Sequence, residues 1–516
     1  MSITTLPDKQ QAEFIRHFNK ALLHHAANRI DQAIKHYRLA LDCNPDHLPS
    51  LQVIALLMQQ NGQHRNALDY YRHAIGLNPH SPVLHNAIAN CYDSCSLLQQ
   101  ARYHYKQAIN LRQDYAEALN NYGNICRKLG DYETAEQSLL DALRLNISVE
   151  TLANLGLLMA EKKKYSAASS FYDHALRIQP ENARVLWNKS LLLLSRGELK
   201  HGWALYDQGL AAKTRPNQIS IDKLPEEKYN REFFRDKVLH IHREQGIGDE
   251  IMFASCLAEI IAISKKCIVE TDDRLVPLFQ RSFKQAKILP RSEILLAHNH
   301  SQDENIDVHI SIASLPRFLR HSFDDFPQAH HYLLAYKQAT SAWKNRYKKL
   351  GDKFAIGISW RGGFGDQGLK RSAELNDWSA LLHRDDCQFV NLQYGQVDEE
   401  LKQFADIVAE WPDTDHFHNL EQLAAQISAL DLVITVSNVT AHLAGALGKP
   451  VWIILPYATN WRWFNGRNPC PWYKQARLFK QNTAGDWQSL FSEVNRELEK
   501  LLQSKQVPKK PLLIND

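Results

Sequence analysis

The sequence contains no long uninterrupted run of apolar residues. None of its runs approaches the ~20 residues that a membrane-spanning helix requires, so no membrane span is expected. The first residues, MSITTLPDKQQAEF, also lack a basic segment followed by an apolar core, and no secretory signal peptide is predicted. Together these absences predict a cytoplasmic protein.

Cysteine and net charge are both low. The eight cysteines are scattered, and although Cys91 and Cys95 share one helix face, no second pair stands at metal-ligand spacing. We therefore expect reduced structural thiols and no metal site. The 61 basic and 57 acidic residues leave a net charge of +4, which argues against a polycation that binds nucleic acid. A length of 516 residues predicts roughly two to four domains.

A spacing of 34 residues recurs along the N-terminal part of the chain, with one residue dropped before the last full copy. The recurring residues are Ala33, Tyr37, Ala40 and Pro45; Ala67, Tyr71, Ala74 and Pro79; Ala101, Tyr105 and Ala108; Ala135, Leu139 and Ala142; and Ala168, Tyr172, Ala175 and Pro180. A weaker copy contains Gly202 and Tyr206. This period, with small residues, an aromatic and a terminating proline, is typical of the tetratricopeptide repeat, a helix pair that stacks into a curved solenoid. The predicted array covers residues 1–210.

Asparagines recur on the first helices of consecutive repeats. These residues are Asn86, Asn90, Asn120, Asn121 and Asn124. First helices line the concave groove of such a solenoid, where an asparagine can bond to an extended peptide backbone without demanding a sequence. The pattern predicts a surface that binds a protein acceptor; a solvated helix surface, and an array that serves only for dimerisation or support, are the alternatives.

The sequence pattern changes from helical repeats to alternating strands and helices after a polar connector at residues 211–236. A strand at 238–242 is followed by a tight loop containing Gly246 and Gly248, a helix at 250–263, and further strands. Two glycines do not make a dinucleotide fingerprint. Asp249 stands at the start of the helix, just past the strand end, and is either a carboxylate that stabilises the helix terminus or a general base that faces a cleft. This first α/β half is predicted to cover residues 237–345.

A second α/β half is predicted for residues 346–516. Its first strand, 354–360, runs into a glycine-rich loop and then Lys370 and Arg371, two cations that hold a diphosphate or a carboxylate, or that are simply solvated. The next strand ends in Gln393 and Tyr394, which are expected to approach the base or ribose of a nucleotide.

The stretch DLVITVSNVTAHLAGALGKPVWIILPYATNWRW is predicted to form strand, loop, helix and strand over residues 432–455. Ser437, Asn438 and Thr440 lie at the start of its helix, where free backbone N–H groups favour a phosphate. Trp461 and Trp463 are interpreted as packing residues, and Arg462 between them is assigned no role. The alternation of strands and helices in both halves predicts parallel sheets, a cleft between the halves and transfer of a group from a nucleotide-activated donor.

Three segments carry a resemblance to a known family: GIGDEIMFASCL, AHLAGALGKPVWIILPYATNWRWF and PWYKQARLFKQ. They resemble bacterial tetratricopeptide proteins with a C-terminal glycosyltransferase domain, similar to the family 9 heptosyltransferases and more distantly to O-linked N-acetylglucosamine transferases. The resemblance implies a GT-B fold of two Rossmann-like halves, the acceptor side at 237–345 and the nucleotide-sugar donor side at 346–516. It also implies that Asp249 is the general base, that no catalytic metal is used and that no cofactor is needed beyond the nucleotide-sugar substrate.

One position departs from the family's pattern, V-D-T-x-x-x-H-L. Here Ser437 and Asn438 replace the aspartate and threonine, which removes a negative charge near the donor, while His442 is kept. A donor with its own carboxylate, such as a CMP-linked nonulosonic acid, fits this change. His442 is expected to contact the phosphate or the leaving oxygen, or to be a packed helix histidine.

The fold class predicted for the whole chain is thus α + α/β, a tetratricopeptide solenoid followed by a GT-B domain. Proteins of this architecture resemble flagellin glycosyltransferases, which implies a serine or threonine acceptor on flagellin. The leading hypothesis is an inverting protein O-glycosyltransferase whose repeats recruit the acceptor. The alternatives are a non-catalytic repeat scaffold with a degenerate transferase domain and a transferase that builds glycans.

Overall fold

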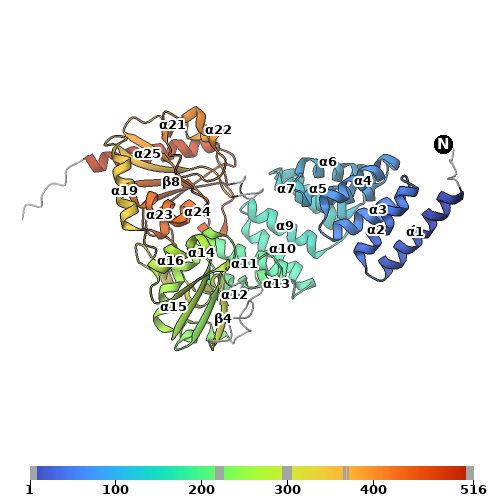
Figure 1. Ribbon diagram of the computed structural model, residues 1–516, viewed down its shortest axis with the longest axis horizontal. Coiled ribbons are helices and arrows are strands. Elements are labelled where there is room, and N and C mark those ends of the chain that lie inside the picture. Colours follow the sequence, from blue (N-terminus) through green and yellow to red (C-terminus); the bar gives the residue numbers. More distant parts are fainter. Residues whose placement is uncertain (1–7, 216–225, 293–304, 364–367, 369–370, 507–516) are drawn as a thin grey trace, which may run out of the picture. The chain divides into compact units, whose positions relative to one another are not determined.

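The computed structural model describes residues 8–215, 226–292, 305–363, 368 and 371–506 (Figure 1). The chain divides into two compact units, Met1–Pro180 and Glu181–Asp516. Lys370 and residues 364–367 of the glycine-rich loop lie outside the described part. No described helix combines the length and the apolar content that crossing a lipid bilayer requires.

The N-terminal unit consists of ten helices in its described residues, and consecutive helices pack as pairs. They are α1 Asp8–Ala26, α2 Ile30–Cys43, α3 Leu48–Gln60, α4 His64–Leu77, α5 Pro82–Ser94, α6 Leu98–Leu111, α7 Ala116–Lys128, α8 Tyr132–Leu145, α9 Val149–Glu161 and α10 Tyr165–Ile178. The recurring alanines and aromatics lie on the second helix of each pair and are buried. Proline follows the ends of α2, α4 and α10, as expected for a residue that cannot continue a helix. The predicted array is therefore confirmed for these five pairs.

Small residues allow the paired helices to approach closely. A Cβ atom at Gly123 on α7 would lie 2.7 Å from Leu139 Cγ on α8, and one at Gly156 on α9 would overlap the ring of Tyr172 on α10. Side chains cannot be added at these contacts without moving a helix. The small residues of the repeat thus mark the positions where the backbones of two paired helices come close together.

The C-terminal unit begins with three further helices, α11 Ala183–Arg196, α12 Leu199–Tyr206 and α13 Gln208–Ala211. Trp203 and Tyr206 of α12 are buried in the core of this unit, where their rings contact Trp461 at centroid distances of 5.7 and 5.5 Å. The weak sixth copy of the repeat, predicted to end the array at residue 210, thus packs into the α/β part of the chain. Its large aromatic side chains are buried in the core of the C-terminal unit rather than against another repeat.

The described residues of the predicted connector are also anchored in the C-terminal unit. Arg215 is buried and forms an ion pair with the buried carboxylate of Glu244, and it donates a 2.9 Å hydrogen bond to Asp207. Phe234, in a short 3₁₀ turn at Arg231–Phe234, is fully buried in the same core. Two side chains of the predicted connector thus belong to the core, which its low periodicity did not indicate.

The first sheet contains four parallel strands in the order β3-β2-β1-β4. The strands are β1 Val238–His242, β2 Lys266–Thr271, β3 Lys287–Pro290 and β4 Val308–Ser311, accompanied by α14 Ile247–Phe253, α15 Leu257–Ile263, α16 Val276–Ser282 and α18 Pro316–Leu319. The next helix, α19 Lys337–Lys348, packs instead against α23 Leu420–Ala429 of the second half. The single helix predicted at 250–263 is interrupted by a 3₁₀ turn at Ala254–Cys256. All-parallel pairing confirms the alternation of strands and helices read from the sequence.

The second sheet contains six parallel strands in the order β10-β9-β8-β5-β6-β7. The strands are β5 Phe354–Ser359, β6 Cys387–Asn391, β7 Val408–Ala409, β8 Leu432–Val436, β9 Val451–Leu455 and β10 Ala476–Lys480, and the helices are α21 Ser379–Leu382, α22 Asp398–Leu401, α23 Leu420–Ala429, α24 Val439–Ala446 and α25 Trp487–Gln506. β8 and β9 occupy the predicted residues.

Apolar side chains cover both faces of this second sheet. Ile434 of β8 belongs to a core cluster that includes Val494 of α25, whereas its neighbour Val433 belongs to a cluster that includes Leu443 of α24. A parallel sheet buried on both faces leaves the carboxyl ends of its strands as the place where polar side chains and ligands gather.

Candidate active site

Two strand–helix units far apart in the sequence meet in the C-terminal unit. Helix α14, which follows β1, packs against α24, which follows β8 (Figure 1). At this contact a Cβ atom on Gly248 would lie 3.0 Å from His442 Cδ2. Glycine at position 248 therefore lets the first unit approach the second closely. Gly246 has a different role. It immediately precedes α14, and its carbonyl oxygen accepts a 2.9 Å hydrogen bond from the backbone N–H of Asp249.

The Asp249 carboxylate lies at this junction and is 15% exposed. Its Oδ1 accepts a hydrogen bond from Arg462 Nε at 2.5 Å, in an ion pair that joins residues 213 positions apart. Its Oδ2 has no hydrogen-bond partner among the described residues. One oxygen thus orients the carboxylate and the other is available for a proton.

Arg462 is held on several sides. It donates to Gln245 Oε1 at 3.1 Å and to Asn460 Oδ1 at 2.9 Å, and its guanidinium lies 4.8 Å from the ring centre of Trp461. Burial disfavours its charge, but its interactions with Asp249, Tyr206 and Tyr473 together outweigh burial, so its pKa lies above the ordinary arginine value. The sequence analysis gave this residue no role. Its position between two tryptophans that are both buried is a signal that would have placed it inside the fold.

Arg371 brings a second cation near the junction. Burial lowers its pKa, and the charge of Arg462 lowers it further, while Tyr394 and Asp249 act in the opposite direction. These influences require all four side chains to lie near one another. Arg371 therefore lies in the same electrostatic neighbourhood as Arg462 and Asp249, and guanidinium groups are well suited to bind an anion such as a phosphate. Lys370, predicted to act with Arg371, lies outside the described residues.

His442 is a buried, uncharged histidine. Burial lowers its pKa to about 3, so the ring is neutral at physiological pH. Its Nδ1 shares a 2.8 Å hydrogen bond with the hydroxyl of Tyr473, and its ring stacks on Trp463 at a centroid distance of 5.0 Å. A neutral imidazole in this position donates or accepts a hydrogen bond without adding charge to the site.

The residues at the start of α24 are largely occupied by bonds within the fold. Ser437 Oγ accepts from Trp463 Nε1 at 2.7 Å. Asn438 caps the helix by accepting from Ala441 N at 3.3 Å, and its amide donates to Ser359 Oγ at 2.7 Å. Asn438 therefore fastens β8 to the end of β5. Thr440 Oγ1, in contrast, is buried with no hydrogen-bond partner among the described residues.

Gln393 is likewise a structural clamp. Its Oε1 accepts from Ser359 Oγ, Trp360 N and Arg361 N at 2.8–2.9 Å, and its Nε2 donates to Tyr394 O at 3.0 Å. The amide that was predicted to read a base or ribose thus holds the loop after β5 in place. Tyr394, the next residue, keeps its ring near Arg371.

A pocket of ≈ 1070 Å³ opens at the carboxyl ends of β5 and β6. Its described lining includes Gly362, Gly363, Ser372, Gln393 and Tyr394. This volume suits a nucleotide-sized ligand, and the glycines let a ligand approach the backbone. The predicted base or ribose contacts, Gln393 and Tyr394, are therefore at the pocket wall.

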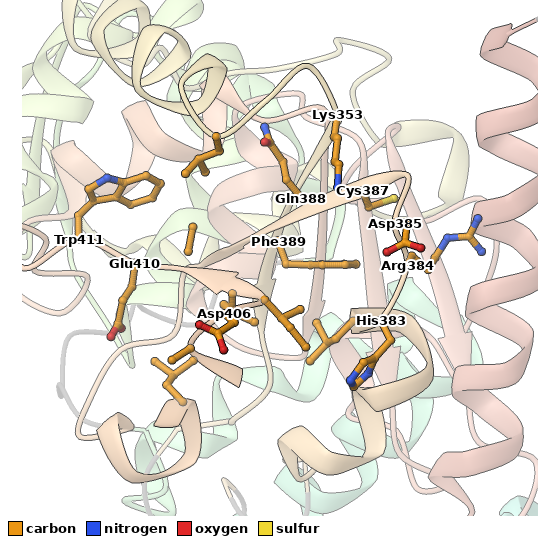
Figure 2. Close-up of a pocket in the computed structure, with 17 residues that line it drawn as sticks. Lys353, His383, Arg384, Asp385, Cys387, Gln388, Phe389, Asp406, Glu410 and Trp411 are labelled. Carbon is orange, nitrogen blue, oxygen red and sulfur yellow. The ribbon is translucent and has the colours of Figure 1, made fainter. Parts of the chain in front are cut away.

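A second pocket, of ≈ 600 Å³, contains none of the predicted site residues. Figure 2 shows that its labelled side chains include Lys353, His383, Arg384 and Trp411, around Phe389 of β6. Cys387, the first residue of β6, also lines it, so this pocket reaches the amino end of a strand whose carboxyl end adjoins the larger pocket.

The asparagines of the N-terminal unit form a hydrogen-bonded ladder along the first helices of three repeats. Asn154 of α9 donates to Asn120 Oδ1 at 3.0 Å, Asn120 donates to Asn121 Oδ1 at 3.2 Å, and Asn121 donates to Asn90 Oδ1 at 3.2 Å. Asn86 donates to Glu117 Oε1 at 2.8 Å. Asn154 was not predicted, although it follows Asn120 by one repeat length and could have been found from that spacing.

The ladder side chains differ in exposure. Asn86 and Asn120 are only 4% and 7% exposed, whereas Asn90 and Asn124 are half-buried. Asn124 accepts a 2.9 Å hydrogen bond from Arg127. Linked amides of this kind present a row of donors and acceptors at fixed spacing.

Comparisons with known proteins agree with the repeat assignment. The tetratricopeptide repeat family matches residues 16–47, 48–81, 104–137 and 149–182. The N-terminal helices are therefore tetratricopeptide repeats.

The chain is similar to Protein FlbA of Caulobacter vibrioides, with 26% identity over 480 residues that cover 89% of this chain and 73% of that protein. This match is longer than either compact unit, so it includes parts of both. The chain also matches the type IV pilus assembly protein PilF of Pseudomonas aeruginosa at 28% identity, over 29% of this chain and 60% of PilF. It matches the human protein O-mannosyl-transferase TMTC3 at 25% identity, over 36% of this chain and 18% of TMTC3. Less than two thirds of PilF and of TMTC3 is covered.

Proposed function

We propose that this protein is an inverting, metal-independent protein O-glycosyltransferase with a GT-B fold, which moves a sugar from a nucleotide-sugar to a serine or threonine of a protein acceptor. The observation that carries the proposal is the meeting of Asp249 with Arg462 and of Gly248 with His442. A carboxylate at one strand–helix unit and a cationic, polar strand–helix unit opposite it are what base-assisted transfer from a phosphate donor requires. Similarity to the O-mannosyl-transferase TMTC3 supports glycosyl transfer, and similarity to FlbA supports the joining of repeats to this C-terminal unit.

Asp249 is the general base in this mechanism. Its Oδ2 takes the proton of the acceptor hydroxyl from about 3 Å, while the ion pair with Arg462 fixes the direction of the carboxylate. The acceptor oxygen then attacks the anomeric carbon and the bond from that carbon to the donor phosphate breaks. Arg371 neutralises the charge that develops on the departing phosphate.

The donor occupies the larger pocket in this proposal. The nucleotide lies along Gly362, Gly363 and Tyr394. The phosphate lies near the start of α24, where Thr440 Oγ1 supplies a hydrogen bond that it does not make to any described residue. Asn438 and Gln393 act indirectly, by holding the loops that shape this pocket. A CMP-linked nonulosonic acid is the candidate donor, because its carboxylate compensates for the acidic side chain that the family has in place of Ser437.

The repeats recruit the acceptor in this proposal. The asparagine ladder offers amide groups to an extended peptide, and a flagellin is the candidate protein. PilF is called a type IV pilus assembly protein, and its likeness to this chain is consistent with repeats that handle a subunit of a surface appendage. Residues 237–345 form the acceptor half and residues 346–516 the donor half in this proposal. Helices α11 and α12 contact both halves, whereas Arg215 is anchored to the acceptor half.

A non-catalytic scaffold is the second candidate. The observation that favours it is the engagement of Asp249, Asn438 and Gln393 by partners within the fold. In that case the C-terminal unit binds a nucleotide or nothing, and transfers no sugar.

The deciding experiment is co-expression of the full chain with a candidate flagellin in a host that makes CMP-nonulosonic acid, followed by intact-mass analysis of the flagellin. We expect a mass increase equal to one or more sugar residues, and a much smaller modified fraction with Asp249→Asn. A flagellin that stays unmodified, while UDP-, GDP-, ADP- and CMP-sugars all fail to raise the melting temperature of the protein, would support the scaffold. Stabilisation by a donor with transfer only to a saccharide would identify a transferase that builds glycans.

A further inference from the structure

Three histidines converge on one face of the first sheet, outside the proposed transferase site. His240 and His242 are two residues apart on β1 and so point to the same face, and His309 is directly opposite His240 on β4. One ring nitrogen from each of the three residues lies within 4.8 Å of those of the other two. His240 and His242 are only 8% and 7% exposed, whereas His309 is exposed to solvent.

The spacing of the nitrogens matches that of ligands around one metal ion. His242 Nε2 and His309 Nδ1 are 3.0 Å apart. Tetrahedral zinc, with Zn–N bonds of about 2.0–2.1 Å, separates its nitrogen ligands by about 3.3 Å. The rings of His240 and His242 are also close, with centroids 4.0 Å apart. One nitrogen of each ring thus lies at or within about 1.5 Å of the separation that ligands have around one zinc ion.

A carboxylate fixes the key ring in the form that binds metal. His242 Nδ1 donates to Glu270 Oε2 on β2 at 3.0 Å, which leaves the lone pair of Nε2 directed toward His309. Metal-binding histidines are commonly oriented by a carboxylate in this way. His309 only has to carry its proton on Nε2 for its Nδ1 to become a ligand as well. No net proton release is then required from these two rings.

The polar cluster is not needed to complete the apolar core. The alternate residues of the same strands, among them Leu239, Ile241 and Ile310, are fully buried in the apolar cluster of this unit. The histidines and Glu270 therefore occupy the face that those apolar side chains leave. Imidazole nitrogens are good ligands for zinc, copper and nickel.

We propose that His240, His242 and His309 bind a divalent transition-metal ion, with Zn²⁺ as the probe, and that Glu270 orients His242 for this role. The fourth position on the ion is taken by water. None of these residues is placed in the transferase machinery, so the metal site and the transferase proposal stand or fall separately.

The test is zinc binding by the full chain. The protein is stripped with a chelator, reloaded with ZnCl₂, dialysed and analysed for metal, with titration calorimetry for the affinity. We expect one zinc per chain that is lost in His309→Ala, a substitution at an exposed position. His383→Ala, at an exposed histidine elsewhere in the same unit, keeps it. Equal zinc in wild type and His309→Ala would overturn the proposal.

Two further variants separate this site from other features. Glu270→Gln should weaken binding by about 10–100-fold while leaving one site. A second group of histidines lies on α1 and α2, where His36 stacks on His17 and His24. His36→Ala disrupts this group and should leave the high-affinity zinc binding unchanged. Co²⁺ in place of zinc should give the visible absorption of a four-coordinate site with three nitrogen ligands and a water in wild type and not in His309→Ala. An unchanged cobalt spectrum in His309→Ala would contradict the assignment.

Discussion

At the scale of single residues, the C-terminal unit shows how much a side chain's role depends on its partners. Asn438 and Gln393 look like ligand-binding residues in the sequence, yet their amides bind Ser359 and the loop after β5. Arg462, which carries no recognisable motif, reaches the Asp249 carboxylate. A residue type limits the chemistry that is available, while the partners within the fold decide how much of it remains for a substrate.

Asp249→Asn is the residue-scale test of the mechanism. We expect transfer to fall by about 10²-fold or more, because the amide cannot take a proton, while it still accepts the hydrogen bond of Arg462. The melting temperature and the stabilisation by donor should stay close to wild type. Asp324→Asn, at an exposed position of the same half, is the matched control and should retain full activity. Turnover of Asp249→Asn near the wild-type rate would remove this residue from the mechanism.

His442 predicts a pH dependence of stability. Its pKa is about 3 in the folded protein and about 6.5 in the unfolded chain, so its contribution is complete above about pH 6.5 and is lost as the pH falls toward 3. Between pH 7 and pH 5 this loss is about 2 kcal/mol. His442→Gln cannot gain this proton.

Urea denaturation at pH 7 and pH 5 measures the effect. The free energy of unfolding of wild type should fall between these pH values by about 2 kcal/mol more than that of His442→Gln. His383→Gln, at an exposed histidine, should follow wild type. If all three proteins lose the same stability on acidification, His442 does not stay neutral in the folded state.

At the scale of helices and strands, the repeats depend on close approach. Gly156→Ala places a methyl group against the ring of Tyr172, and we expect it to destabilise the N-terminal unit by about 1–3 kcal/mol. Gly76→Ala is the matched control, because nothing lies within 4 Å of the added atom and the helical backbone gains about 0.5–1 kcal/mol. Thermal unfolding of both variants compares them. Equal melting temperatures of Gly156→Ala and Gly76→Ala would show that α9 and α10 can move apart without loss of stability.

At the scale of the whole molecule, the division of the chain is decided by packing. A chain that begins at Glu181 keeps Trp203, Tyr206, Arg215 and Phe234, and we expect it to fold. A chain that begins at Lys237 loses all four and leaves Glu244 buried without its arginine. Since each large buried aromatic contributes about 3–5 kcal/mol, this shorter chain should fail to unfold cooperatively or should melt at least about 10 °C lower.

Circular dichroism melting of the two truncated chains tests this division. Equal stability would mean that α11, α12 and the connector are dispensable for the α/β part. The longer of the two chains also tests recruitment: it should still be stabilised by the donor yet modify the protein acceptor poorly. Full transfer without residues 1–180 would remove the repeats from acceptor binding.

Local patterns in the sequence were sufficient to predict the repeats, the parallel strands and the two strand–helix units that hold Asp249 and His442. These patterns express backbone sterics and burial over a few turns or strand residues, which neighbouring residues set among themselves. Register and packing between distant segments decided the rest. They paired Asp249 with Arg462 across 213 positions, His242 with His309 across 67, and drew α12 and Arg215 into the C-terminal core. Such contacts form only when separate elements fold against one another, so no spacing along the chain encodes them.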